Sequence, residues 1–597
     1  MDNKNYTWDL DSLLNGKTLD ELYSEWVNSE NEVYSIYPNF YKTKENFEHW
    51  LDVNEKNEII SNHLMNYISN NLQEDLVNPK WLGYVQKIRL FSNEMSVKMS
   101  GYLNLVLEHK KEIQEYLKDP KLSEHIRDFE LQFKHEKHVL DPKIEEALSK
   151  ASAADGAVDQ IFSTLTDSDI KFKDALNSKN EPIKLKTIGD IHNYLKNEDR
   201  TLRKNVWINF HSAYDQYANT LSQTLYYNYL KLNTNAKIHN FEDYVSASAY
   251  SDEIDVSFIT TLYEQVQKFK DIHTKYRNAL DNLLKKQLNI EKVEPWDRSV
   301  DLCQKQINVT IEQTQEIVLE ALRPLGEEYC SQIKRAFDER WISWLPKENK
   351  MSGAYSIGGV KGLSKFFINM NFDGTMNSVE TVAHELGHSM NSYYSVKNQK
   401  VNPETCIFYA EIASITTETL LTLYLLNKYK DDKTIVNMYI KLLMDNFFAC
   451  TTRQIEFSNF EFEANKMVNN GISFNAESCK QLYVDMLKKY ENISPEAEEK
   501  FKLEPYKHYL STILRIPHFY SGNFYVYKYA IGQICGLIVA NKIFNGDTKM
   551  KDDFIKFLSS GSSLSPLDTI KLLGIDLTTS QPYEQVINII NELLEKF

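Results

Sequence analysis

The sequence predicts a mainly helical protein, and two observations carry this prediction. Glycine occurs 19 times and proline 14 times in 597 residues, well below their ordinary shares of roughly 7% and 5%. An all-β fold needs a turn about every ten residues, so the chain has too few turn residues for one. Most of its length instead repeats apolar residues every three or four positions, which is the period of an amphipathic helix.

The helical pattern covers residues 19–150, in segments rich in Glu, Lys, Leu and Tyr. Between residues 155 and 188 the stretches FSTLTDSDIKFKDAL and EPIKLKTIGD alternate apolar and polar residues, which indicates a small strand pair. We place a domain boundary there. The prediction is an N-terminal helical lobe over residues 1–188 and a second domain over residues 189–597.

The second domain is expected to be helical with one small sheet. Helical periodicity runs over residues 190–337, and glycines then cluster between residues 341 and 374. Within that stretch KFFINMNF alternates as a half-buried strand does. After residue 377 the helical pattern returns and continues to the final INIINELLEKF.

Charge and composition exclude several classes of protein. A formal net charge of −16 argues against a nucleic-acid binder. The chain has no apolar stretch of the ~20 residues that a membrane span needs, and its start lacks the basic and apolar regions of a secretory signal. Six cysteines without a CxxC pair favour reduced thiols. We therefore expect a cytoplasmic protein that does not bind membranes, and the sequence does not predict its oligomeric state.

The segment VETVAHELGHSMNSYYS contains the pattern H-E-x-x-H. On a helix, His384 and His388 lie one turn apart on the same face, so both imidazoles can bind one metal ion. Glu385 points about 100° away and can act as general base on a water at the metal. The pattern indicates a catalytic zinc site, although two buried core histidines beside a surface glutamate are the ordinary alternative.

Asn377 and Glu380 have the spacing of a capping box, which would start a helix just before the motif. Glu380 therefore has two possible roles. It is either the partner of the cap or a carboxylate that orients a zinc-bound histidine, and the sequence leaves both open.

A catalytic zinc uses three protein ligands and keeps its fourth position for water, so a third ligand must come from elsewhere in the chain. In FYAEIASITTETLLTLYLL, Glu411 and Glu418 are seven residues apart on an otherwise apolar helix and share one face. Buried carboxylates are costly unless they are paired or bound to metal. We predict Glu411 as the third ligand and Glu418 as the carboxylate behind a ligand, with two ordinary solvated positions as the alternative.

HELGHSMNSYYS followed by AEIASITTE resembles oligoendopeptidase F, within the wider group of zinc metallopeptidases that includes thimet oligopeptidase. The opening YTWDLDSLL, the stretches GAYSIGG, MNFDGT and RIPHFYSGNFYVYKYAIG, and the tail FLSSGSSLSPLDTIKLLGIDL are similar to segments of that family in the same order. The resemblance implies a two-lobed, mainly helical zincin-type metallopeptidase. In such a fold a small β-sheet lies next to the zinc helix, a deep cleft takes the substrate, and residues 189–597 form the catalytic domain.

The resemblance also implies roles for particular residues. It matches Glu411 to the third zinc ligand and Glu418 to its partner, in agreement with the reasoning from spacing. It implies that a C-terminal segment closes over the substrate and steadies the oxyanion, with His518, Tyr525, Tyr527 and Tyr529 as the matching residues. Which tyrosine points inward stays open, and any one of them could be a packing aromatic in a chain with 36 tyrosines.

Two further positions follow from the resemblance. The family usually has a histidine where this chain has Asn391, which keeps hydrogen bonding but loses basicity and so alters a contact behind the ligands or with substrate. The family strand that binds extended peptide by backbone pairing matches Gly353, Ala354, Tyr355 and Ser356.

Taken together, the sequence predicts an endopeptidase with one zinc ion per chain, held by His384, His388 and Glu411. Glu385 would take a proton from the attacking water and pass it to the leaving amine. The expected substrates are short, unfolded oligopeptides. The alternative is a peptidyl dipeptidase or metallocarboxypeptidase on the same zinc site, which would need a binding site for the free carboxylate of its substrate.

Overall fold

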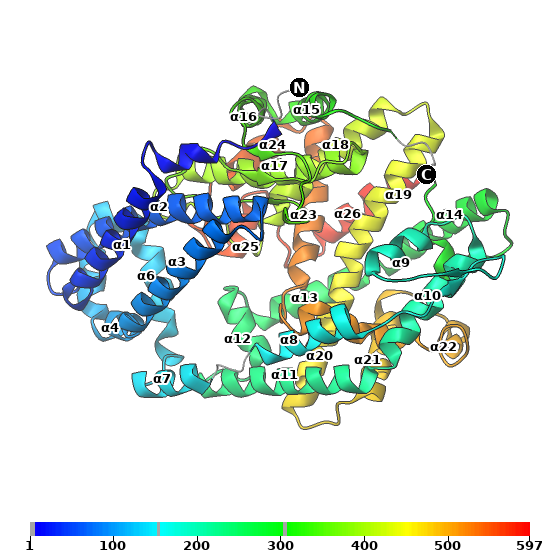
Figure 1. Cartoon of the computed structure of the whole chain (residues 1–597), viewed down its shortest axis with the longest axis horizontal. Coiled ribbons are helices and arrows are strands. Elements are labelled where there is room, and N and C mark those ends of the chain that lie inside the picture. Colours follow the sequence, from blue (N-terminus) through cyan, green and yellow to red (C-terminus); the bar gives the residue numbers. More distant parts are fainter. Residues whose placement is uncertain (1–5, 152–155, 303–306) are drawn as a thin grey trace. The chain divides into compact units, whose positions relative to one another are not determined.

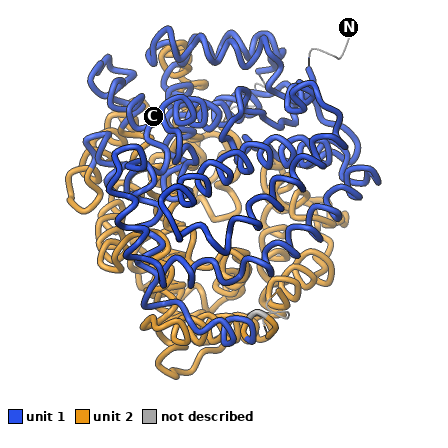
Figure 2. The backbone as a smooth tube through the Cα atoms, turned by 90° about the vertical axis from the view of Figure 1, so that its left-hand side faces the viewer, with its two compact units in different colours: residues 1–147, 307–424, 539–575 blue, residues 148–306, 425–538, 576–597 orange. Residues whose placement is uncertain are grey.

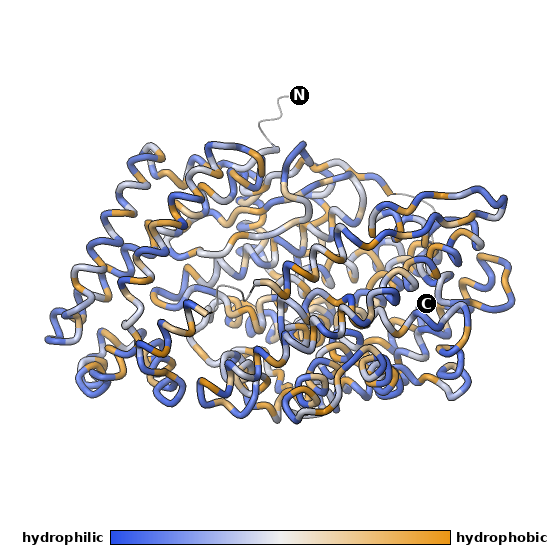
Figure 3. The backbone as a smooth tube through the Cα atoms, turned by 60° about the horizontal axis from the view of Figure 1, so that its bottom comes forward, coloured by the Kyte–Doolittle hydropathy of each residue, from blue (hydrophilic) through white to orange (hydrophobic). Residues whose placement is uncertain are grey.

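The computed structural model describes residues 6–151, 156–302 and 307–597. Its chain is mostly helical, with short strands, as the sequence predicts (Figure 1). Hydrophobic and hydrophilic residues alternate along many of the helices, as expected for helices that bury one side (Figure 3). No helix in the described residues is long and apolar enough to cross a membrane.

The chain divides into two compact units, each built from three segments (Figure 2). Unit 1 comprises residues 1–147, 307–424 and 539–575, and unit 2 comprises residues 148–306, 425–538 and 576–597. Because each unit combines distant parts of the sequence, neither is one continuous stretch. The division of the chain into domains at residue 188 stays a prediction.

Unit 1 starts with long helices that pack against each other, α1, α2 and α3. The Thr18 side chain caps α1 in a capping box with Glu21, and the Thr43 side chain caps α2. The helices of this unit are α1 (Leu19–Ile36), α2 (Lys44–Glu74), α3 (Pro79–Lys98), α4 (Tyr102–Glu108), α5 (Lys110–Tyr116), α6 (Ile126–Lys134), α15 (Ile311–Leu322), α16 (Glu327–Asp338), α17 (Met376–Asn398), α24 (Thr548–Leu558) and α25 (Pro566–Lys571).

A three-stranded sheet lies beside α17 in unit 1. Its strand order is β3 (Ile342–Ser343), β5 (Ile368–Asn369) and β4 (Tyr355–Ser356). β3 runs parallel to β5, and β4 runs antiparallel to it with Ser356 opposite Ile368. β4 is therefore an edge strand. The sequence prediction of a strand within KFFINMNF and of a small sheet next to the motif helix is confirmed.

Unit 2 is a second helical body with its own core. Its helices are α8 (Ala157–Ser163), α9 (Ile188–Leu195), α10 (Arg200–Asp215), α11 (Ala218–Ile238), α12 (Tyr244–Ser251), α13 (Val256–Gln267), α14 (Lys270–Leu288), α19 (Lys433–Cys450), α20 (Thr452–Asn469), α21 (Ala476–Tyr490), α22 (Pro495–Lys500) and α26 (Gln581–Leu594). Three helices have residues in both units: α7 (Pro142–Ala151), α18 (Glu411–Lys428) and α23 (Tyr527–Phe544).

The strand pair predicted between residues 155 and 188 is present but shorter than expected. β1 (Ala175–Leu176) pairs antiparallel with β2 (Pro182–Ile183). The preceding stretch, residues 157–169, is helical instead. Phe162 and Leu165, three residues apart, are both buried. Apolar residues therefore recur there with the spacing of a helix and not with the alternation of a strand.

Candidate metal centre

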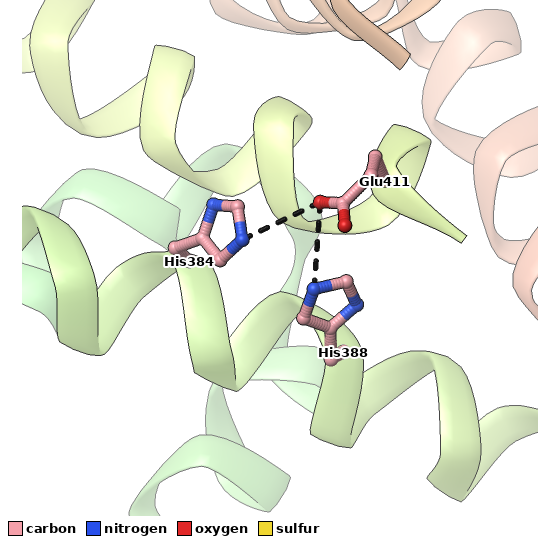
Figure 4. A group of neighbouring side chains, drawn as sticks. All are labelled: His384, His388 and Glu411. Atoms are coloured by element: carbon pink, nitrogen blue, oxygen red, sulfur yellow. Dashed lines mark ion pairs between the residues drawn. The ribbon is translucent and has the colours of Figure 1, made fainter. Parts of the chain in front are cut away.

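The two histidines of the motif meet one glutamate from the next helix (Figure 4). His384 and His388 lie one turn apart on α17, and Glu411 is the first residue of α18. Glu411 Oε2 lies 3.4 Å from His384 Nε2 and 3.5 Å from His388 Nε2. The structure thus brings together the three residues that the sequence predicts as metal ligands.

This donor set fits a zinc ion in both chemistry and spacing. Imidazole nitrogen and carboxylate oxygen are zinc ligands, with bonds of roughly 2.0–2.2 Å. Two ligands of a tetrahedral ion at such distances lie about 3.3–3.6 Å apart, from the same bond lengths. The measured separations of 3.4 and 3.5 Å therefore match two edges of a tetrahedral site.

Glu418 contacts the other side of the His384 ring. Its Oε2 lies 3.1 Å from His384 Nδ1, which fixes the ring so that Nε2 faces Glu411. Burial alone would lower the pKa of His384, but hydrogen bonds to Glu411 and Glu418 outweigh it and raise this pKa to about 10. Burial opposes ionisation of Glu411, yet the two histidines hold the pKa of Glu411 well below its usual range. Both effects favour an ion pair between protonated His384 and ionised Glu411, and a metal ion that binds here replaces the proton of His384.

Glu385 lies beside this cluster and is 7% exposed. Burial raises the pKa of Glu385, and the nearby His384 and His388 partly oppose that shift. Its carboxylate also accepts a hydrogen bond from the backbone N–H of Ser356 on β4. A buried carboxylate with a raised pKa is suited to accept and return a proton.

Close contact between α17 and α18 sets the distance between the ligands. A Cβ on Gly387 would lie 2.6 Å from Ser414 Cα and 2.8 Å from the Ala413 oxygen, so only glycine fits here. The Thr417 hydroxyl donates to the Ala383 oxygen across the two helices at 2.7 Å. The Ser414 hydroxyl donates to Glu411 Oε2 at 2.8 Å. Sequence reasoning did not identify these contacts, because the only signal for Gly387 was a glycine in the middle of the motif helix.

Strand β4 joins the site through its predicted peptide-binding residues. The Ser356 hydroxyl lies 2.9 Å from the Ser389 hydroxyl of α17, and the Tyr355 hydroxyl donates to Asn70 at 2.8 Å. Gly353 is exposed with φ +89°, and Ala354 is partly buried. Tyr355 and Ser356 therefore form the edge strand beside the motif helix, and Gly353 and Ala354 directly precede it.

Two predicted residues of the motif helix, Glu380 and Asn391, make no hydrogen bond or ion pair with the three ligands in the described part of the chain. Glu380 is 6% exposed, and burial together with the charge of Glu418 raises its pKa to about 8. The Asn391 side chain donates to Thr405 Oγ1 at 2.8 Å. The helix does not begin at Asn377, since its N-cap is Thr375, whose hydroxyl bonds Asp373. The predicted capping box of Asn377 with Glu380 is therefore wrong.

The predicted C-terminal residues form a separate cluster in unit 2. The His518 ring stacks on Tyr525 with centroids 6.2 Å apart, and the Tyr529 hydroxyl lies 3.5 Å from His518 Nε2. Burial lowers the pKa of His518. Tyr527 lies apart from this cluster, since it is fully buried and its hydroxyl donates to Asp252.

Known proteins that are similar to this chain are peptidases. The profile of peptidase family M3 matches residues 193–589, and the profile named oligopeptidase F matches residues 108–172. An oligoendopeptidase F homologue of Mycoplasma pneumoniae is 38% identical over 98% of this chain and 96% of its own. Oligopeptidase PepF of Bacillus subtilis is 32% identical over 78% of this chain and 67% of its own.

The fold has a counterpart among solved structures. The crystal structure of oligoendopeptidase-F from Enterococcus faecium superposes with a TM-score of 0.71 at 23% identity, over 96% of this chain and 97% of that one. At this identity the likeness shows the fold alone.

Proposed function

The chain belongs to peptidase family M3 and is a metalloendopeptidase, and from this premise we propose that it is a zinc-dependent enzyme that cleaves short, unfolded oligopeptides. The observation that carries the proposal is the group of His384, His388 and Glu411, with Glu385 beside it. One zinc ion per chain would be held by these three ligands. When bound, zinc would polarise the scissile carbonyl and make a water more acidic.

We assign the proton transfers to Glu385. Its carboxylate would take a proton from the water that attacks the carbonyl and would return it to the leaving amine. Burial of Glu385 and the resulting upward shift of its pKa support this role, since a base that later acts as an acid needs a pKa near neutrality.

Backbone pairing with β4 would bind the substrate. β4 (Tyr355–Ser356) is an edge strand that contacts the motif helix, and an extended peptide can add to such an edge and to the preceding residues 353–354 through main-chain hydrogen bonds. A folded protein cannot offer an extended segment of this kind. Selection of short, unfolded peptides with loose sequence preference, in the deep cleft that the family resemblance implies, is therefore part of the proposal.

Oxyanion stabilisation is proposed for the cluster in unit 2. His518, Tyr525 and Tyr529 carry ring N–H and phenol O–H donors of the kind that an acyl-transfer transition state needs. Tyr527 is the tyrosine least suited to this role, because its hydroxyl is engaged by Asp252. The cytoplasmic location stays a prediction.

Product mapping of internally quenched peptides of increasing length tests the proposal, with wild type and Glu385→Gln compared side by side. Wild type should cut internal bonds of the short peptides, and Glu385→Gln should be slower by about 10²–10⁴-fold with its zinc content unchanged. His388→Ala should lose both zinc and activity. Equal turnover by wild type and Glu385→Gln would refute the mechanism.

A further inference from the structure

A cavity of about 290 Å³ lies in unit 1 between helices α2 and α6. Its volume is close to the lower limit of roughly 300 Å³ for small-molecule pockets in proteins. The two helices share one hydrophobic core, in which the centroids of the Phe47 and Phe129 rings lie 5.1 Å apart. Every residue that lines the cavity belongs to unit 1, and none of them is a residue of the metal centre.

One face of α6 lines this cavity with three polar side chains. His125 directly precedes the helix, and Asp128 and Gln132 follow it by three and seven residues, so the three side chains lie on the same side. In the described part of the chain the Asp128 carboxylate and the His125 ring make no hydrogen bond or ion pair. Gln132 Oε1 is likewise a buried acceptor without a hydrogen-bond partner among these residues. The face therefore presents polar groups that the protein itself does not satisfy.

The other charged groups of the lining have partners. Glu58 Oε2 lies 2.8 Å from Lys361 Nζ, and Glu55 Oε2 lies 3.7 Å from Lys400 Nζ. Asp128 is therefore the one carboxylate of the lining that has no ion pair within the described ranges. Lys361 is the only lysine or arginine of the lining, and it is already paired. The cavity thus has an unpaired site for a cation and none for an anion.

Burial sets the charge state of the two titratable groups on this face. Desolvation raises the pKa of Asp128 to about 6, although the charges of Lys361 and Arg127 oppose this shift. The carboxyl group is still mostly ionised at pH 7, in surroundings that disfavour its charge. Arg127 is engaged elsewhere, since its Nε donates to the Ser562 oxygen at 2.7 Å. Burial lowers the pKa of His125, so its ring is neutral and one ring nitrogen can accept a hydrogen bond.

We propose that the cavity binds a small organic ammonium ion, whose charge pairs with the Asp128 carboxylate. An ammonium group has three N–H donors, and the His125 ring and the Gln132 amide are further acceptors on the same helix face. Trp50 and Phe129, both buried, line the cavity as well and would contact the apolar body of the ligand. A cation beside an aromatic ring gains additional attraction. The proposal goes beyond the proposed peptidase function, because none of these residues takes part in it.

The ammonium group can belong to a free amine or to the N-terminal residue of a peptide. Titration calorimetry on the zinc-loaded full-length chain tests both sources with three probes. Phenethylamine is the free amine, phenylalaninamide represents a peptide N-terminus, and phenethyl alcohol has the same apolar body without the charge. The variants are Asp128→Asn, His388→Ala and Glu130→Gln. Glu130→Gln removes an exposed carboxylate of the same helix and is the matched control for the loss of one negative charge.

Wild type should bind phenethylamine about 10- to 100-fold more tightly than phenethyl alcohol, as expected for a charge-assisted hydrogen bond. Asp128→Asn should lose this difference, and Glu130→Gln should keep it. His388→Ala should also keep it, because the cavity shares no residue with the metal centre. Binding of phenylalaninamide as well as phenethylamine would assign the site to peptide N-termini too, and binding of phenethylamine alone would assign it to free amines.

The melting temperature without ligand separates a binding role of Asp128 from a structural one. A carboxylate without a partner contributes no contact to the fold, so Asp128→Asn should melt at the temperature of wild type or above it. A lower melting temperature would overturn the proposal, as would equal affinity of wild type and Asp128→Asn for phenethylamine. Loss of binding in His388→Ala would place the amine at the metal centre instead. Absence of phenethylamine binding by wild type at millimolar concentration would also overturn the site, and peptidase activity would be unaffected by any of these outcomes.

Discussion

Each side chain of the site has a function that follows from what it touches. Glu411 contacts both histidines, Glu418 contacts Nδ1 of His384, and Glu385 contacts the backbone of β4. Three glutamates of similar sequence context therefore differ in chemistry, because burial and neighbouring charges differ at each position. This division of roles leads to two predictions about single substitutions.

Glu418→Gln should weaken zinc binding by about 10–100-fold, because the carboxylate that orients His384 and raises its basicity is lost. Competition with a fluorescent chelator measures the affinity. Glu404→Gln is the matched control, since the Glu404 carboxylate accepts the Val360 N–H instead of contacting a ligand. Unchanged zinc affinity in Glu418→Gln would show that this carboxylate does not support the site.

Tyr529→Phe should affect mainly catalysis, whereas Tyr527→Phe should affect mainly stability. Tyr529 lies at His518, so removal of its hydroxyl should lower kcat by up to about 10²-fold with little change in the melting temperature. Tyr527 donates to Asp252 in the core, so removal of its hydroxyl should lower the melting temperature through a buried acceptor left without its donor. If Tyr527→Phe reduces kcat more than Tyr529→Phe does, this assignment of the two tyrosines is incorrect.

The crossing of two helices is the structural element that builds the metal site. His384 and His388 are placed by one helix, but their distance to Glu411 depends on how closely α17 and α18 approach. Gly387 permits that approach, and the hydrogen bond from Thr417 to the Ala383 oxygen holds it. A similar dependence on close backbone contact is the usual reason for glycine inside a helix interface.

Gly387→Ala should therefore reduce zinc affinity, even though alanine is the better helix former. Its Cβ would lie 2.6 Å from Ser414 Cα, so the helices must separate and move Glu411 away from the histidines. We expect zinc affinity to fall by at least about 10-fold, the range seen when the orientation of a ligand is lost. Gly83→Ala, in helix α3 where a Cβ meets nothing within 4 Å, is the control and should bind zinc as wild type does.

Stability of the molecule as a whole should depend on pH through a buried acid outside the metal site. Glu461 on α20 is fully buried and accepts the Phe524 N–H at 2.8 Å. Desolvation raises its pKa from 4.5 to about 8. Between pH 4.5 and about pH 8 the carboxyl group is ionised in the unfolded chain but protonated in the folded chain. The free energy of unfolding therefore falls as pH rises, by at most about 1.4 kcal/mol per pH unit.

Glu461→Gln keeps an acceptor for Phe524 and cannot ionise, so it should remove this part of the pH dependence. The melting temperature of the variant relative to wild type should increase between pH 5 and pH 8, as measured by calorimetry. Glu463→Gln, on the same helix but partly exposed, should follow wild type over this range. A constant difference between Glu461→Gln and wild type would mean that Glu461 titrates normally.

Much of this could be predicted from the sequence, because the signals involved are local. The scarcity of glycine and proline and the helical period predict the helical fold, and the spacing of His384 and His388 places both on one helix face. Spacing also indicates that Glu411 and Glu418 share a face. The helix start at Thr375 and the helical conformation of residues 157–169 were not predicted, because several residues in each segment fit more than one local structure.

The sequence by itself determined which residues can bind a metal and on which helices they lie, since helix geometry converts spacing into direction. The tertiary structure alone decided that Glu411 lies 3.4 Å from His384 and that Tyr527, unlike Tyr529, is engaged by a buried acid. The physical reason is that such contacts join segments far apart in the chain, and the close packing of helices, rather than any local pattern, sets which side chains meet.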